Sequence, residues 1–181
     1  MRVRLVVLAI LVAPIAFAEP VRTQNAGLRF SHPAEWVRVP APSDMRAAQF
    51  RVPKAGGDAE DAEVVLFFFG KGQGGGAQEN LERWYGQMTQ PDGKASKDAG
   101  VVTMKTINAL KVTALDLPGT YKGMPSGPGA APVSKSGYRL LAAVVEGDGG
   151  PWFFRIVGPD ATVKAAKPGF DALLASLEAH Q

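Results

Sequence analysis

The sequence predicts an α+β fold, in which helices pack on a mainly antiparallel sheet. Short runs of apolar and β-branched residues are separated by turn signals, and several are joined as hairpins. Two segments repeat apolar residues at helical spacing. Gly (21) and Pro (14) are frequent among the 181 residues, which is typical of a chain with many turns and loops.

The N-terminal segment has the features of a secretory signal. Arg2 and Arg4 precede an apolar run at 5–17, and Ala16-Phe17-Ala18 fits the small-x-small rule for cleavage after Ala18. The run is shorter than the roughly 20 residues that span a bilayer, and no cysteine follows it to carry a lipid anchor. We therefore expect 1–18 to be a signal peptide and 19–181 to form one domain, periplasmic or secreted.

The first part of the mature chain predicts a series of strands. Short strands are expected at 28–31 and 36–39, and a longer one at 45–52 alternates apolar and polar residues. The segment 63–69 reads EVVLFFF and is nearly all apolar. Such a strand is normally covered on both faces, so we expect it to be central in the sheet.

A Gly-rich loop at 70–76 leads into the first predicted helix, at about 77–88. Apolar residues recur there at helical spacing, which predicts one buried face. That face comprises Leu81, Trp84, Tyr85 and Met88. The adjoining polar stripe comprises Asn80, Arg83 and Gln87.

Two strands are expected next, at 101–107 and 110–117, joined at Asn108-Ala109. This is a weaker hairpin turn than Asn-Gly, because alanine resists a positive φ. The segment 122–137 holds several Gly and Pro residues, and we expect it to form a long mobile loop within the domain.

The clearest hairpin joins strands at 138–146 and 152–157 through a Gly-rich turn. Arg155 interrupts the apolar second strand, and we expect it either in water at an edge or paired with Glu146 across the hairpin. A last helix is predicted at about 161–179, with a kink or restart at Pro168.

Composition excludes several classes of function. The absence of cysteine excludes disulfides, iron–sulfur clusters, a thiol nucleophile and cysteine zinc sites. His32 and His180 have no neighbours at metal-ligand or triad spacing, and GxSxG, SxxK and HExxH motifs are absent. Without the signal the chain has 18 basic and 17 acidic residues, with no dense basic patch, so nucleic-acid binding is not expected. No catalytic residue, metal site or cofactor is predicted.

The loop at 70–76 formally matches GxGxxG between a strand and a helix. Dinucleotide binding is disfavoured because the next strand carries no acid at its end for a ribose hydroxyl. A small anion held by loop amides at the helix N-terminus is a second interpretation, with Lys71, Gly72, Gln73 and Gly74 as its residues. A plain flexible connection is the third.

The polar stripe of the first helix is the other candidate surface. Asn80, Arg83 and Gln87 with Trp84 would form a recognition face beside the loop, since Trp and Arg are common anchors of binding surfaces. The competing interpretation is an ordinary amphipathic helix with a buried Trp and solvated neighbours.

Three segments of the chain resemble the PsbP-like fold: FSHPAEW at 30–36, GPWFFRIVGP at 150–159 and TVKAAKPGFDALLASL at 162–177. PsbP is an extrinsic, lumen-facing accessory subunit of photosystem II, and a Ran-binding nuclear import factor shares the fold. The segment FFFGKGQGGGAQENLERW at 67–84 is similar to that of small secreted bacterial proteins of unassigned function. The resemblance implies an α/β/α sandwich and a non-enzymatic accessory or binding role, and it carries over no catalytic or photosystem-specific site.

Two functional hypotheses follow from these observations. The first is an exported, non-catalytic accessory or binding module that acts through contacts with a protein partner. The second is a small-anion or small-ligand binder, or an unrecognised hydrolase, that uses the Gly70–Gly76 loop. The sequence names neither the partner nor the oligomeric state.

Overall fold

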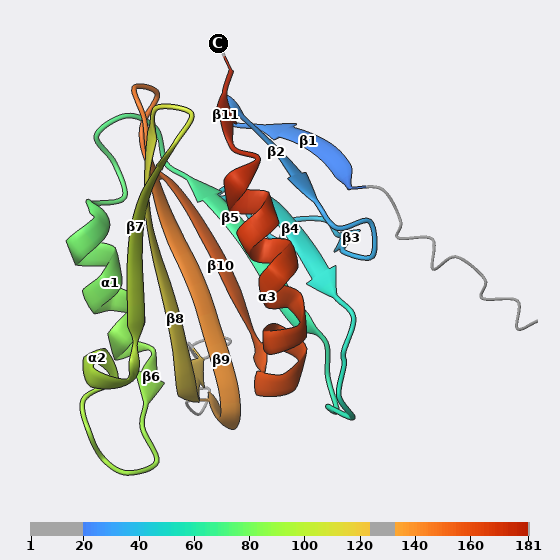
Figure 1. The fold of residues 1–181 in the computed structure, drawn as a ribbon, viewed down its shortest axis with the longest axis vertical. Helices are drawn as coiled ribbons and strands as arrows, with labels where there is room; N and C mark the ends of the chain where they lie inside the picture. Colours follow the sequence, from blue (N-terminus) through green and yellow to red (C-terminus); the bar gives the residue numbers. More distant parts are fainter. Residues whose placement is uncertain (1–19, 124–132, 181) are drawn as a thin grey trace, which may run out of the picture.

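A computed structural model describes residues 20–123 and 133–180 of the chain. The predicted signal peptide with its cleavage after Ala18 lies outside the described residues, as does the middle of the loop predicted at 122–137. The described residues form strands and helices in the order shown in Figure 1. The strands are β1 (Val21–Asn25), β2 (Leu28–His32), β3 (Val37–Arg38), β4 (Arg46–Val52), β5 (Ala62–Phe68), β6 (Met88–Thr89), β7 (Val101–Ile107), β8 (Leu110–Gly123), β9 (Val133–Glu146), β10 (Trp152–Pro159) and β11 (Glu178–Ala179). The helices are α1 (Ala77–Gly86), α2 (Ser96–Ala99) and α3 (Asp160–Ala175).

The larger of two sheets has the strand order β3-β4-β5-β10-β9-β8-β6, with β7 also paired to β8. Its strand pairs are antiparallel, and β5 and β10 lie side by side near its centre. The hairpin predicted from the sequence is formed by β9 and β10, and it pairs Trp152 with Val145. The hairpin of β7 and β8 turns at Asn108 and Ala109, which both adopt a positive φ, at 47° and 67°. This geometry fits the twist of a two-residue hairpin.

Both faces of this sheet are covered, which confirms the predicted class of an antiparallel sheet with helices packed on it. Alternate residues of β9 point to opposite faces. Leu141, Ala143 and Val145 belong to the apolar cluster beneath α3. Their neighbours Leu140, Ala142 and Val144 belong to the cluster beneath α1. The helices α1 and α3 therefore lie on opposite sides, and Figure 1 views the molecule from the α3 side.

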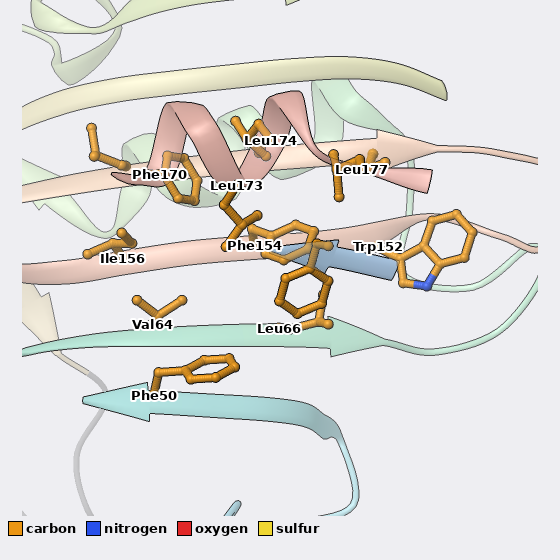
Figure 2. Packing of buried hydrophobic residues seen from close by; sticks show 14 of the residues in the cluster. Phe50, Val64, Leu66, Trp152, Phe154, Ile156, Phe170, Leu173, Leu174 and Leu177 are labelled. Atoms are coloured by element: carbon orange, nitrogen blue, oxygen red, sulfur yellow. The ribbon is translucent and has the colours of Figure 1, made fainter. Parts of the chain in front are cut away.

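The cluster beneath α3 is the larger of the two, and Figure 2 shows its packing. It joins side chains of the sheet to the inner face of the helix. Phe154 meets Phe30 of the small sheet edge to face, with ring centroids 5.4 Å apart. The labelled members are Phe50, Val64, Leu66, Trp152, Phe154, Ile156, Phe170, Leu173, Leu174 and Leu177.

The end of α3 differs from the prediction. The helix runs through Pro168 without a restart and stops at Ala175, whereas the sequence predicted it to continue to 179. The hydroxyl of Ser176 donates to the carbonyl of Leu173 at 2.7 Å and accepts from the Ser31 amide at 2.8 Å. These two hydrogen bonds direct the chain after α3 toward β2. There the strand β11 pairs with β2, with Glu178 opposite Arg29.

A second, three-stranded sheet has the order β1-β2-β11, and the sequence analysis missed its two outer strands. Leu28 and Phe30 of β2 point from this sheet into the larger core. The indole of Trp152 donates to the carbonyl of Ala26 at 2.8 Å, which fixes the turn between β1 and β2 against the main sheet.

The loop predicted at 122–137 is shorter than expected. Lys122 and Gly123 extend β8, and they pair with Ser134 and Val133 of β9. The expectation was wrong for these flanking residues because all three prolines lie at 124–132, while the flanks pair as a hairpin despite Gly123 and Gly137.

Arg139 of β9 connects the sheet to the start of α3. Its guanidinium binds Asp116 of β8 and the carboxylate of Asp160, the latter with Nε 2.8 Å from Oδ1. Lys164, one turn along the helix, also binds Asp160. Burial alone would raise the pKa of Asp160, but the hydrogen bonds and charges of Lys164 and Arg139 together lower it below its ordinary value of 3.8.

We expect Asp160→Asn to destabilise the protein at pH 7 and to matter much less in acid. A carboxyl group with a lowered pKa stabilises the folded state above its ordinary pKa, and this contribution is lost as the pH falls through the lower folded value. Urea unfolding from pH 7 down to about pH 3 measures the effect. Asp44→Asn, at an exposed loop position, is the control. A difference between Asp160→Asn and the native chain that stays constant over this range would contradict the assignment.

Candidate binding site

A pocket of about 190 Å³ lies between α1 and the adjoining ends of β5 and β10; we call it the α1 pocket. The sequence analysis had placed four of its residues on one helix surface, and the structure brings them together here. These four are Asn80, Arg83, Trp84 and Gln87. The sheet contributes Phe67, Phe69, Phe153 and Arg155, which the sequence analysis had not assigned to a site.

Aromatic rings form the walls of the α1 pocket. Phe153 of β10 pairs with Phe67 of β5, so both rings rise from the same face of the sheet. Phe69 stacks on Phe67 with ring centroids 6.1 Å apart and contacts Phe153 at 5.8 Å. Trp84 is buried in the cluster beneath α1, whereas Phe69 is 41% exposed. The walls of the α1 pocket therefore extend from the protein core, at Trp84, to the surface, at Phe69.

Arg155 projects into this pocket from the middle of the sheet. The two interpretations offered for it were wrong, because β10 lies between β5 and β9, and Arg155 faces Val65 and Ala142 across these pairings. Its guanidinium donates to Oε1 of Gln87 at 3.1 Å and lies 5.8 Å from the ring centroid of Phe67. Glu146 is four positions along β9 from Ala142 and forms no ion pair with Arg155 among the described residues.

Asn80 holds the other polar side of the α1 pocket. It is only 2% exposed, although the sequence pattern placed it on a polar stripe. Its Nδ2 donates to the carbonyls of Gly74 and Gly76, at 3.0 and 2.9 Å, and its Oδ1 accepts from Arg83 at 2.6 Å. The available signal was an asparagine in the first turn of a helix, where such a side chain can bind backbone carbonyls of the preceding residues.

The α1 pocket carries two positive charges without an internal counter-ion. Within the described part of the chain, neither Arg83 nor Arg155 forms an ion pair, whereas Arg29, Arg46, Arg51 and Arg139 each do. A guanidinium has five N–H donors, and Arg83 and Arg155 each use one to bind an amide oxygen. The remaining N–H donors suit an anion. Arginine, amide and aromatic side chains as classes do not change protonation state near neutral pH.

The Gly-rich loop packs against the aromatic wall. Gly74 has a φ of 83°, and a Cβ atom there would lie 2.6 Å from the Phe153 ring and 2.8 Å from the Phe69 ring. Glycine is therefore required at this position for both its backbone conformation and its close approach. Gly72 has a similar φ of 75°, but a Cβ atom there would meet open space.

Anion binding by this loop stays a prediction, and two features disfavour it. The amide of Gly76, the N-cap residue of α1, donates to Oε2 of Glu79 at 2.8 Å, so the chain's own carboxylate lies at the helix N-terminus. Lys71 and Gly72 line a separate hollow that also contains Glu146 and Asp148. Carboxylates at both places would repel an anion. Gln73 is held by a turn, in which its amide donates to the carbonyl of Gly70.

The other candidate residues are dispersed. His32 is buried against Phe50, and His180 lies beside Arg29 with its Nδ1 3.3 Å from the guanidinium. In the described ranges, His, Asp and Glu side chains form no group of three that would suit a metal ion. None of the helices in those ranges has the length and apolar character needed to cross a membrane.

The sheet order and the two helix layers define a PsbP-like fold. The chain is similar to the solution structure of cyanobacterial PsbP (CyanoP) from Synechocystis sp. PCC 6803, with a TM-score of 0.53 and 15% identity over 93% of this chain and 96% of the other. A second solved structure, the protein of unknown function PA94 from Pseudomonas aeruginosa, aligns with a TM-score of 0.47 and 12% identity, over 87% of this chain and 95% of that one. The chain matches no family model and no curated protein sequence.

We expect Gly74→Ala to destabilise the protein more than Gly72→Ala. Both changes place alanine at a positive φ, which costs about 1 kcal/mol. Only the change at Gly74 also pushes a methyl group into the Phe153 and Phe69 rings, which adds about 1–3 kcal/mol. Urea unfolding at pH 7 compares the two variants. Equal losses would show that the loop does not pack on the aromatic wall.

Proposed function

We propose that this protein is an exported, non-catalytic accessory protein that binds a protein partner through the α1 pocket. The observation that carries this proposal is a pair of guanidinium groups, on Arg83 and Arg155, that meet only amides and aromatic rings in an open pocket. Arginine is enriched at the energetic centres of protein interfaces, and two arginines line this pocket.

The chemistry of the α1 pocket favours binding over catalysis. General acid–base or nucleophilic catalysis needs a group that gains or loses a proton, or an activated nucleophile, within reach of the substrate. The pocket's lining consists of arginine, amide and aromatic side chains, which recognise a ligand by charge and shape. The second hypothesis, a ligand site or hydrolase at the Gly70–Gly76 loop, has less support because Glu79 caps the helix there.

Export is supported by the basic, apolar and small-residue regions of 1–18. An exported chain without cysteine relies on packing alone, and the two-sided apolar core described above provides it. The PsbP-like fold agrees with an accessory role, which was what the sequence resemblance implied.

Export predicts that the mature protein begins at Glu19. Cells that produce the full chain should yield, outside the cytoplasm, a polypeptide whose N-terminal sequence is EPVRTQ. Replacing Ala18 with a bulky charged residue, as in Ala18→Arg, should make the uncleaved precursor accumulate, because the cleavage site requires small residues. N-terminal sequencing of cell fractions measures both results. A native chain that keeps 1–18 in the cytoplasm would contradict the prediction.

Partner binding predicts that capture depends on the two arginines of the α1 pocket. The tagged mature protein is crosslinked in its native cells, and captured proteins are quantified by mass spectrometry. A specific partner should fall at least fivefold with Arg83→Ala or Arg155→Gln, because each removes an unpaired charge from the contact surface. Trp84 is left unchanged, since it is buried and its loss would disturb the fold.

Arg38→Gln is the matched control for this capture, because Arg38 is an exposed arginine on β3. Circular dichroism confirms that each variant is folded before capture. Partners recovered equally with the native protein, both pocket variants and the control would overturn the proposed function.

A further inference from the structure

We infer that the α1 pocket recognises a carboxylate next to a flat apolar side chain, presented by an acidic segment of the partner protein. This inference rests on the proposed function and adds the chemistry that the partner must offer. It is built from the fixed position of each guanidinium, the acids around them, and the size and walls of the pocket.

Arg155 supplies a positioned charge. Its backbone belongs to β10, which is hydrogen-bonded on both sides, so the side chain starts from a rigid point. The amide oxygen of Gln87 at 3.1 Å and the ring of Phe67 at 5.8 Å hold the guanidinium in place. A guanidinium that is already oriented loses less conformational entropy when it binds a carboxylate with two parallel hydrogen bonds.

Arg83 supplies the second charge from the helix. The buried Asn80 accepts one of its hydrogen bonds at 2.6 Å, and Asn80 is itself tied to the loop carbonyls. Arg83 and Arg155 therefore reach one pocket from two different elements. Two guanidinium groups at one small site favour a carboxylate over a neutral polar group.

The nearest acids in the chain are engaged elsewhere. Glu63 shares the sheet face of Arg155, but its carboxylate binds Arg46 at 3.0 Å and Gln49 at 2.5 Å. Glu79 accepts from the Gly76 amide, and Glu82 accepts from Gln78. Within the described residues none of these acids forms an ion pair with Arg83 or Arg155, so both guanidinium groups keep N–H donors for a partner that carries the opposite charge.

The size and walls of the α1 pocket limit what accompanies the carboxylate. Its volume of about 190 Å³ is below the range of about 300 Å³ and above that is typical of pockets for drug-sized ligands, so it suits one side chain. The rings of Phe67, Phe69 and Phe153 offer faces and edges to a flat apolar group. A peptide that places such a side chain beside an Asp or Glu satisfies both features.

The test uses two peptides that differ only in charge, N-acetyl-Phe-Glu-amide and N-acetyl-Phe-Gln-amide. Each is titrated into the isotope-labelled mature protein and followed by NMR of the backbone amides and the arginine Nε–H groups. We expect the Glu peptide to shift resonances of α1, β10 and the Arg83 and Arg155 side chains, and to bind at least fivefold more tightly than the Gln peptide. The preference should weaken as NaCl is raised, since screening acts on the charge.

Further titrations test the contribution of the aromatic ring, of the carboxylate and of each arginine separately. N-acetyl-Ala-Glu-amide, which lacks the ring, should bind at least threefold more weakly than the Phe-Glu peptide. Arg155→Gln and Arg83→Gln should each abolish the preference for Glu over Gln, whereas Arg38→Gln should retain it. Arg83→Gln changes an exposed helix residue, so it keeps the test valid if Arg155→Gln disturbs the sheet.

Equal affinities of the Glu and Gln peptides, shifts that map away from the α1 pocket, or no shift with a folded protein would each overturn the inference. These outcomes differ from a failure of the proposed function. If capture of the partner depends on Arg83 and Arg155 but the peptides show no charge preference, the surface is right and its ligand chemistry is wrong. If capture ignores both arginines, the proposed function fails first.

Discussion

The structure depends on the burial of its central strands from both sides. Residues 140–145 of β9 are each at most 1% exposed, and Phe154 and Ile156 of β10 are equally buried. A sheet of this kind is stable only if each face has a cover of its own. The helix α3 and the three-stranded sheet supply one cover, and α1 supplies the other. The small side chains of Ala142 and Ala143 leave room for these layers to approach.

The α1 pocket follows from the unequal length of these covers. The helix α1 has ten residues and is about 15 Å long, whereas the eight residues of β10 span about 26 Å. The helix therefore leaves part of its face of the sheet without a cover. Arg155 is tolerated on a central strand because it is half-buried beside the open α1 pocket, where Gln87 at the end of α1 and Phe67 support it.

The sequence predicted the features that depend on local signals. The hairpin of β9 and β10, the strand β5 and the burial of Leu81 and Trp84 on α1 follow from turn residues, apolar runs and helical spacing. The predicted helix at about 77–88 was too long, because α1 ends at Gly86 and Met88 belongs to β6. The hairpin at Asn108-Ala109 formed despite an unfavourable alanine, because the long pairing of β7 with β8 imposes the turn. The helix side of the α1 pocket was also predictable, since Asn80, Arg83 and Trp84 lie on α1 and Gln87 caps its C-terminus. Its sheet side was not, because the side chains that approach the helix are set by the pairing of β5 with β10.

The outer strands of the small sheet were not predicted, because this sheet pairs β2 with β11 from a distant part of the chain. This distant pairing affects how the chain folds. β2 is paired on one side with the preceding strand and on the other with β11, where Ala179 lies opposite Leu28. A chain synthesised from its N-terminus presents β2 long before β11, so this edge of β2 has no partner strand while the intervening residues are made. Contacts between residues so far apart in sequence are slow to form, because a long loop must close first. The small sheet is therefore completed only after the residues between β2 and β11 have been made, since Glu178 and Ala179 supply its third strand.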